Sequence, residues 1–192
     1  MQPTIPSRTR ILRLLSAYEP SGDDDRDARE RIVRFVEEHA DCFDRSLVVG
    51  HITGSAWIVD PARSRCLLTH HRKLDRWLQL GGHADGEADV LAVAMREARE
   101  ESGLTSLRAV STAIFDCDVH AIPERKAERE HYHYDVRFLV EADPDEPLVV
   151  SDESHELAWI ELANVTSLSN DRSVLRMVRK TVVQPPIATS AT

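Results

Sequence analysis

The sequence predicts an α/β domain built in layers, with a mixed β-sheet between helices. A chain of 192 residues with 42% hydrophobic content is long enough for one well-buried core plus an appendage, and too short for two ordinary domains. Segments rich in β-branched residues alternate with helical ones, an order typical of a sheet covered by helices. We therefore expect an N-terminal helical extension at residues 1–46, a main domain at residues 47–183 and a disordered tail at residues 184–192.

The first forty residues carry the signals of two helices. Apolar residues at positions 11, 12, 14 and 15 have helical spacing, and a Pro-Ser-Gly sequence at residues 20–22 predicts a break after them. Three aspartates at residues 23–25 suit the start of a second helix, because the backbone dipoles there favour negative charge.

Beyond Phe43 the pattern changes to short strands. Segments near residues 47–52, 54–60 and 65–70 predict strands, and the Asp-Pro-Ala-Arg sequence at residues 60–63 predicts the turn of a hairpin between the last two. A helix at residues 89–102 would end at Gly103 in a left-handed cap. Strands are predicted at residues 108–120, 132–141 and 157–160, followed by a last helix from Asn170 that Pro185 and Pro186 stop.

The composition limits which binding partners and which cellular location are expected for this protein. A formal net charge of −9 and a pI near 5.5 argue against a surface built to bind nucleic acid or anionic membranes. No secretory signal or membrane span is evident, so the expected location is the cytoplasm. Cys42, Cys66 and Cys117 form no C-x-x-C pair, which predicts buried thiols and no disulfide framework or structural zinc site. A homodimer through the N-terminal helices remains open.

Three carboxylates share one face of the helix predicted at residues 89–102. Glu97, Glu100 and Glu101 stand at i, i+3 and i+4, so their side chains project together. Such spacing costs an isolated helix a few tenths of a kcal/mol per like-charged pair, which a bound cation offsets. Carboxylate oxygens are ligands that hard cations prefer, and the spacing therefore predicts a Mg²⁺ or Mn²⁺ site.

The stretch from residue 81 to residue 104 resembles the Nudix box, the signature of hydrolases that cleave a nucleoside diphosphate linked to another group. The family pattern is G-x5-E-x7-R-E-U-x-E-E-x-G-U, where U is aliphatic. The positions in register are Gly82, Arg96, Glu97, Glu100, Glu101, Gly103 and Leu104. The first glutamate of the pattern falls on Ala88, and we expect Glu87 or Asp89 to replace it imperfectly. The resemblance implies a Nudix-type α/β/α sandwich over roughly residues 47–183.

The resemblance also implies roles for individual residues. Glu97, Glu100 and Glu101 would be catalytic metal ligands, joined by the backbone carbonyl of Gly81, and Arg96 would steady Glu97 or Glu100. Some Nudix enzymes carry a further glutamate, acting as base or ligand, on a loop after the central strands. In this chain we favour Glu153 for that role, then Glu156.

A second polar group is predicted on two later strands. Strand alternation places Asp118 and His120 on one face of their strand and His131 and His133 on one face of theirs, and antiparallel pairing would gather the four into a patch. This patch can contact substrate, bind a second metal or be a solvated sheet face.

Two residues near the glycines are further candidates for substrate binding. Arg72 precedes the Gly81–Gly82 pair, where Nudix enzymes commonly shape substrate pockets, and its guanidinium suits phosphate. His83 directly follows the glycines, and its side chain either contacts the substrate or only stabilises the turn.

The leading functional hypothesis is Mg²⁺-dependent (or Mn²⁺-dependent) hydrolysis of a diphosphate linkage in a nucleotide-type small molecule, by attack of metal-activated water at phosphorus. One rival is a prenyl diphosphate isomerase, but Cys66-Leu67-Leu68-Thr69-His70 lacks the Cys-Ser-His-Pro-like context of its catalytic cysteine. The other rival is a non-catalytic, ligand-sensing Nudix domain. The substrate stays open among ADP-ribose, nucleotide sugars, dinucleoside polyphosphates, coenzyme A derivatives and damaged nucleoside triphosphates, because recognition resides in variable loops.

Overall fold

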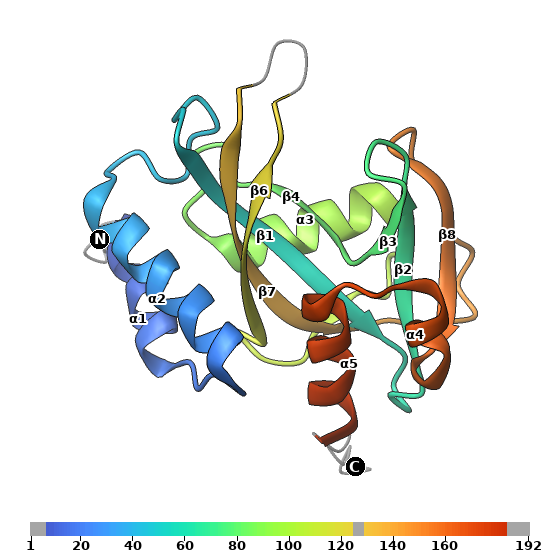
Figure 1. Ribbon diagram of the computed structural model, residues 1–192. Helices are drawn as coiled ribbons and strands as arrows, with labels where there is room; N and C mark the ends of the chain where they lie inside the picture. Colours follow the sequence, from blue (N-terminus) through green and yellow to red (C-terminus); the bar gives the residue numbers. More distant parts are fainter. Residues whose placement is uncertain (1–6, 125–128, 184–192) are drawn as a thin grey trace, which may run out of the picture.

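The structure is a computed structural model that describes residues 7–124 and 129–183, and the tail predicted at residues 184–192 lies outside the described residues. A twisted mixed sheet runs through the middle (Figure 1), with α3 (Val90–Ser102) behind it and α5 (Arg172–Val183) in front. The helices α1 (Ser7–Ala17) and α2 (Asp23–Glu38) lie together on one side. The predicted α/β fold class is confirmed.

The sheet is organised around its longest central pair, β1 (Gly50–Val59) and β7 (His131–Glu141), which run parallel with His51 opposite His133. β1 also pairs antiparallel with β2 (Arg65–His71) and with β4 (Leu80–His83), and β2 pairs with β3 (Arg76–Leu78) and β8 (Ser154–Glu161). β5 (Arg108–Ala109) and β6 (Asp116–Ile122) both pair antiparallel with β7. The 3₁₀ turn η1 (Leu162–Asn164) and the short helix α4 (Val165–Leu168) connect β8 to α5.

Alternation along β1 gives the sheet two different faces. Ile52, Ala56 and Ile58 belong to a core that also contains apolar residues of α1, α2 and α3. Trp57 and Val59 face the other way, into a core closed by α5. The N-terminal half of that second face instead carries polar side chains, which begin with His51.

Two strand predictions were wrong in their boundaries. Residues 47–52 and 54–60 were expected as separate segments, but β1 continues through Gly54. This glycine marks close packing, because a Cβ there would lie 2.7 Å from the Val90 carbonyl oxygen at the start of α3. The strand expected at residues 108–120 is divided into β5 and β6, because residues 110–115 bulge out between two stretches that both pair with β7.

Local signals fixed the ends of α3. Asp89 Oδ1 accepts a hydrogen bond from the Ala92 amide at 3.3 Å, as an N-cap does, and Gly103 takes the left-handed conformation with φ 72°. The predicted glycine cap is confirmed. The helix carrying the acidic face is therefore held at both ends.

The three cysteines, Cys42, Cys66 and Cys117, are free and buried, as the sequence predicted. Among the described residues, no helix has the length and apolar character needed to cross a bilayer.

A buried ionic network joins α2, β6, β7 and α5. Asp116 accepts hydrogen bonds from Arg137 at 3.2 Å, from Arg176 Nε at 2.8 Å and from Lys180 at 2.6 Å. Lys180 also bonds Asp25 Oδ2 at 2.7 Å, which ties α5 to the start of α2. The network fixes the two helices relative to the polar face of the sheet.

Asp25 predicts an acid-dependent loss of stability. Burial alone raises its pKa, but hydrogen bonds from Lys180, Ser21 and Tyr18 outweigh burial and hold the pKa below its ordinary value. The folded state then binds fewer protons than the unfolded state, where an aspartate titrates near about pH 3.9. We expect Asp25→Asn to be less stable than the parent at pH 7, and the difference to shrink below about pH 4.

Urea unfolding of both proteins at pH 7 and near pH 3 measures this convergence. The exposed Asp27→Asn change on the same helix serves as the control and should give a small, pH-independent difference. A difference for Asp25→Asn that stays constant with pH would contradict the assignment.

Candidate active site

The acids of α3 meet the Gly81–Gly82 segment at the end of β4. Glu101 Oε1 accepts a hydrogen bond from the Gly81 amide at 3.1 Å, which holds the last turn of the helix against the strand. Glu97 is also half-buried at this junction, whereas Glu100, one turn along, is exposed to solvent. The arrangement puts the carboxylates of Glu97 and Glu101 beside one backbone segment and leaves Glu100 next to them on the solvent side.

Burial, and then the crowding of like charges, shifts the pKa values of the acids in this cluster. Burial raises the pKa of Glu101 to about 8, with further contributions from the charges of Glu97, Glu153 and Glu100, although the Gly81 hydrogen bond opposes the rise. Burial also raises the pKa of Glu97, against the lowering effect of Arg96. A cation bound between these groups would favour their ionised forms.

Arg96 links the helix to the strand end. Its Nη2 donates to Glu97 Oε1 at 2.7 Å and to the His83 carbonyl oxygen at 3.0 Å. The same guanidinium therefore fixes the rotamer of Glu97 and the position of β4. Of the two carboxylates that the sequence offered as its partner, the structure pairs Arg96 with Glu97.

Glu153 approaches the cluster from the loop before β8. Its charge raises the pKa of both Glu97 and Glu101, whereas Glu156 lies in β8 opposite His70. Arg72 fastens this loop: its amide donates to the Glu153 carbonyl oxygen at 2.8 Å and its Nη2 to the Ser154 carbonyl oxygen at 3.0 Å. The structure thus places Arg72 beside Glu153, with its guanidinium bonded to the backbone.

The residues flanking Ala88 have structural partners. Glu87 Oε1 accepts from the Asp89 amide at 2.8 Å, and Asp89 caps α3 and pairs with Arg10 at 2.8 Å. Both acids thus stabilise the start of α3, at the opposite end of the helix from Glu101.

Gly82 allows Glu97 to approach the strand. A Cβ at this position would lie 2.5 Å from Glu97 Cδ, and only a flexible side chain would have to move. We expect Gly82→Ala to displace the carboxylate and lower kcat/KM by roughly 10–100-fold, since ångström-scale misplacement of a reacting group costs about that much. Steady-state kinetics together with circular dichroism would measure this effect.

The matched control is Gly22→Ala, where an added Cβ meets nothing within 4 Å. Full activity of Gly82→Ala would show that Glu97 tolerates displacement and would remove it from the reacting groups.

Histidines from four strands gather on the polar face of the sheet. The predicted antiparallel pairing is confirmed, with His120 opposite His133 and Asp118 opposite Asp135. His83 Nε2 and His131 Nε2 lie 3.3 and 3.4 Å from His133 Nε2. The structure adds His51, whose ring centroid lies 4.8–5.0 Å from those of His83, His131 and His133.

The polar alternation at the start of β1 is the sequence signal that marks His51. This residue is the first inward position of a strand whose next inward residues, Thr53 and Ser55, are also polar, and both donate to Asp135 Oδ1 at 2.8 Å. Burial and the neighbouring histidines lower the pKa of His51 to about 4 and that of His133 to about 2. Both imidazoles are therefore neutral at physiological pH.

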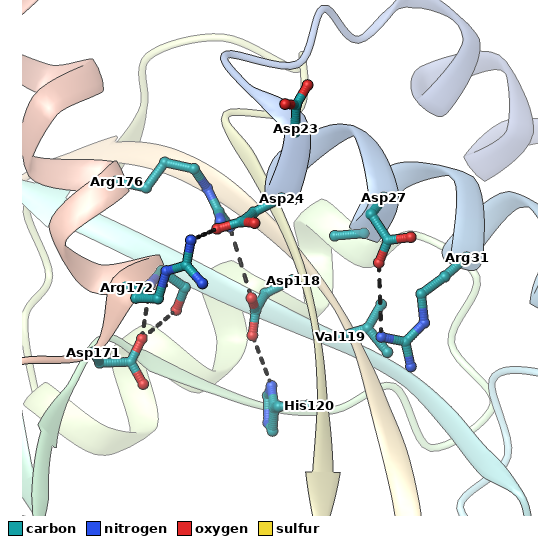
Figure 2. Close-up of a pocket in the computed structure, with 12 residues that line it drawn as sticks. Asp23, Asp24, Asp27, Arg31, Asp118, Val119, His120, Asp171, Arg172 and Arg176 are labelled. Atoms are coloured by element: carbon teal, nitrogen blue, oxygen red, sulfur yellow. Dashed lines mark hydrogen bonds and ion pairs between the residues drawn. The ribbon is translucent and has the colours of Figure 1, made fainter.

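A groove of about 590 Å³ opens beyond this face, between α2, β6 and the start of α5. Figure 2 shows Asp24 and Arg172 facing each other across it, paired at 2.6 Å, with Asp118 and His120 on its floor. Arg176 Nη2 reaches Asp118 Oδ1 at 3.7 Å. The carboxylates of α3 do not line this groove, which adjoins the histidines through His120.

The donor set at the α3–β4 junction fits a hard divalent cation. It consists of carboxylate oxygens on one helical turn beside a glycine backbone, and the pKa of one acid, Glu101, is raised mainly by burial and further by the neighbouring charges. An open, oxygen-rich site of this kind suits Mg²⁺ or Mn²⁺, which retain waters and share them with phosphate groups. The residues that would hold the ion are Glu97, Glu100, Glu101 and the Gly81 carbonyl, with Glu153 close by.

A comparison with protein families matches residues 51–179 of this sequence to the NUDIX domain. A comparison with curated proteins found no match.

Solved structures with similar folds are Nudix proteins and related hydrolases. The fold is similar to a Nudix hydrolase, RenU, from M. smegmatis, with TM-score 0.55, 20% identity and coverage of 72% of this chain and 90% of that one. It is similar to a C. elegans Ap4A hydrolase in a binary complex, with TM-score 0.53, 17% identity and coverage of 69% and 95%. The NUDIX domain of Shewanella oneidensis NrtR, crystallised with ADP ribose, matches with TM-score 0.50, 14% identity and coverage of 77% and 96%.

Proposed function

Because this chain belongs to the Nudix family, we propose that it hydrolyses a diphosphate linkage in a nucleotide-derived small molecule with Mg²⁺ or Mn²⁺ as cofactor. The observation that carries this proposal is the junction of α3 and β4. There Glu101 accepts from the Gly81 amide and Arg96 holds Glu97 against the same strand. Family membership alone does not guarantee hydrolysis, so the argument rests on the retained acids.

The chemistry requires negative charge to be neutralised on the diphosphate oxygens, and this is what the bound divalent cation supplies. Glu97, Glu100 and Glu101 would hold it, and their fixed positions on one helical turn orient the substrate phosphates relative to the protein. Arg96 is a positioning residue in this scheme, because its guanidinium bonds Glu97 and the His83 carbonyl.

Glu153 is the residue we assign to accept a proton from the attacking water. It reaches the cluster from outside the helix and is exposed to solvent, so a water molecule can lie between it and the acids of α3. Its loop is positioned by the two hydrogen bonds from Arg72. Arg72 is therefore proposed to act in two ways, by fastening that loop and by offering positive charge near the phosphates.

The polar face of the sheet provides the surface for the rest of the substrate. His83 joins the face to the catalytic junction, since it lies in β4 directly after Gly82. His83, His120, His131 and His133 are proposed to contact this part of the substrate through their aromatic ring faces, which suit a sugar or base. Neighbours of the same fold, an Ap4A hydrolase and a Nudix domain crystallised with ADP ribose, make a nucleotide with a phosphoanhydride bridge the first substrate class to test.

The test is a substrate panel with purified protein. Dinucleoside polyphosphates, ADP-ribose, nucleotide sugars, coenzyme A derivatives and nucleoside triphosphates are each incubated with Mg²⁺ or Mn²⁺, and phosphate is measured after coupling to a phosphatase. We expect metal-dependent turnover of at least one class and none with EDTA. Failure across the panel, with tight binding of one compound, would reject hydrolysis in favour of a ligand-sensing domain.

A further inference from the structure

We propose that this chain holds a transition-metal ion of the zinc class on the imidazoles of His51, His131 and His133, at a site separate from the carboxylates of α3. This site does not depend on the proposed hydrolysis. The ligands come from two parallel strands: His51 stands opposite His133 in the β1–β7 register, and His131 lies two residues before His133 on the same face. One nitrogen from each ring lies within 4.8 Å of the others.

The spacing between the His131 and His133 nitrogens matches the requirement of a small metal ion, and one nitrogen of His51 lies within 4.8 Å of both. Two imidazole nitrogens bound tetrahedrally at 2.0–2.1 Å from zinc lie roughly 3.3–3.4 Å apart. His131 Nε2 lies 3.4 Å from His133 Nε2, and His83 Nε2 lies 3.3 Å from the same atom. His83 adjoins the site but does not belong to the group of three whose nitrogens all lie within 4.8 Å of one another.

His51 supplies an independent observation. Its side chain is only 3% exposed, and neither Nδ1 nor Nε2 has a hydrogen-bond partner. A buried polar group without a partner costs about 1–3 kcal/mol, so such groups are rare unless a function retains them. Coordination of a metal would satisfy one of these nitrogens.

Nδ1 of His131 already has the kind of hydrogen-bond partner that metal-binding histidines usually have. His131 Nδ1 lies 2.8 Å from the Arg129 carbonyl oxygen, which can only accept, so Nδ1 carries the proton. Nε2 then presents its lone pair toward His133. A backbone carbonyl that fixes the tautomer in this manner is the usual outer partner of a metal-bound histidine.

The donor chemistry selects the class of ion. Neutral imidazoles suit zinc, copper, nickel and iron, whereas Mg²⁺ prefers oxygen ligands. The two sites on this chain should therefore prefer different metal ions. The carboxylates of α3 should bind Mg²⁺ or Mn²⁺, and the histidines should bind an ion of the zinc class.

The test is zinc binding by full-length protein without a histidine tag, stripped with EDTA and titrated with Zn²⁺ in excess Mg²⁺ so that the carboxylates are occupied. We expect about one equivalent to bind. His131→Gln and His133→Gln should weaken binding by more than the roughly 10–100-fold that loss of an outer partner costs. Cobalt(II) should give the visible absorption of a tetrahedral nitrogen site, which both variants lose.

Two controls assign the ion to its site. His39→Gln changes a histidine outside the cluster and should bind zinc as the parent does, and so should Glu100→Gln, which alters only the carboxylate site. Because His131 is only half-buried, its replacement tests the proposal even if His133→Gln fails to fold. The proposal is overturned if no stoichiometric zinc binds, if His131→Gln binds it unchanged, or if Glu100→Gln abolishes binding.

Discussion

Glu100→Gln is expected to lower turnover by more than about 100-fold, because loss of even an outer partner of a bound metal costs about 10–100-fold. The substitution keeps the size of the side chain and removes one negative charge from the cluster. Glu100 is exposed, so the change should leave the free energy of unfolding within about 0.5 kcal/mol of the parent. Turnover at saturating Mg²⁺ and thermal unfolding of the same preparations measure the two effects.

The matched control for this prediction is Glu37→Gln, an exposed glutamate on α2 outside the cluster. It should retain full activity. Unchanged turnover in Glu100→Gln would reject its role as a metal ligand, and a large loss of stability would show that the side chain serves the fold.

Asp116→Asn is expected to destabilise the protein by about 3–5 kcal/mol, the usual cost of removing one partner from a buried ionic group. The carboxylate is fully buried and accepts from Arg137, Arg176 and Lys180. Asparagine keeps the shape but leaves these three cations with less negative charge inside the protein. The unfolding temperature should fall by roughly 6–20 °C for a chain of this size.

Urea unfolding of the variant measures the loss directly, and Asp145→Asn on an exposed turn is the matched control, expected within about 0.5 kcal/mol of the parent. A loss under about 1 kcal/mol for Asp116→Asn would mean that the network is compensated by its other acids, Asp118, Asp135 and Asp25.

Elements with strong local signals could be predicted from the sequence. The start of α2 after the break at residues 20–22, the cap at Gly103 and the turn at residues 60–63 each depend on a few adjacent residues, and all are present in the structure. The strands were harder, because a strand is defined by its neighbours. Gly54 could be placed inside β1 only once α3 was seen to pack against it.

The candidate site likewise combines features that adjacent residues determine with features that only the fold determines. The spacing of Glu97, Glu100 and Glu101 by itself determined that three carboxylates share a helical face, since helix periodicity is a property of adjacent residues. Only the tertiary structure brought that face to Gly81 and set Glu153 beside it. It also decided the histidine cluster, because the parallel register of β1 and β7 places His51 opposite His133 across some eighty residues of chain, and no local pattern encodes that pairing.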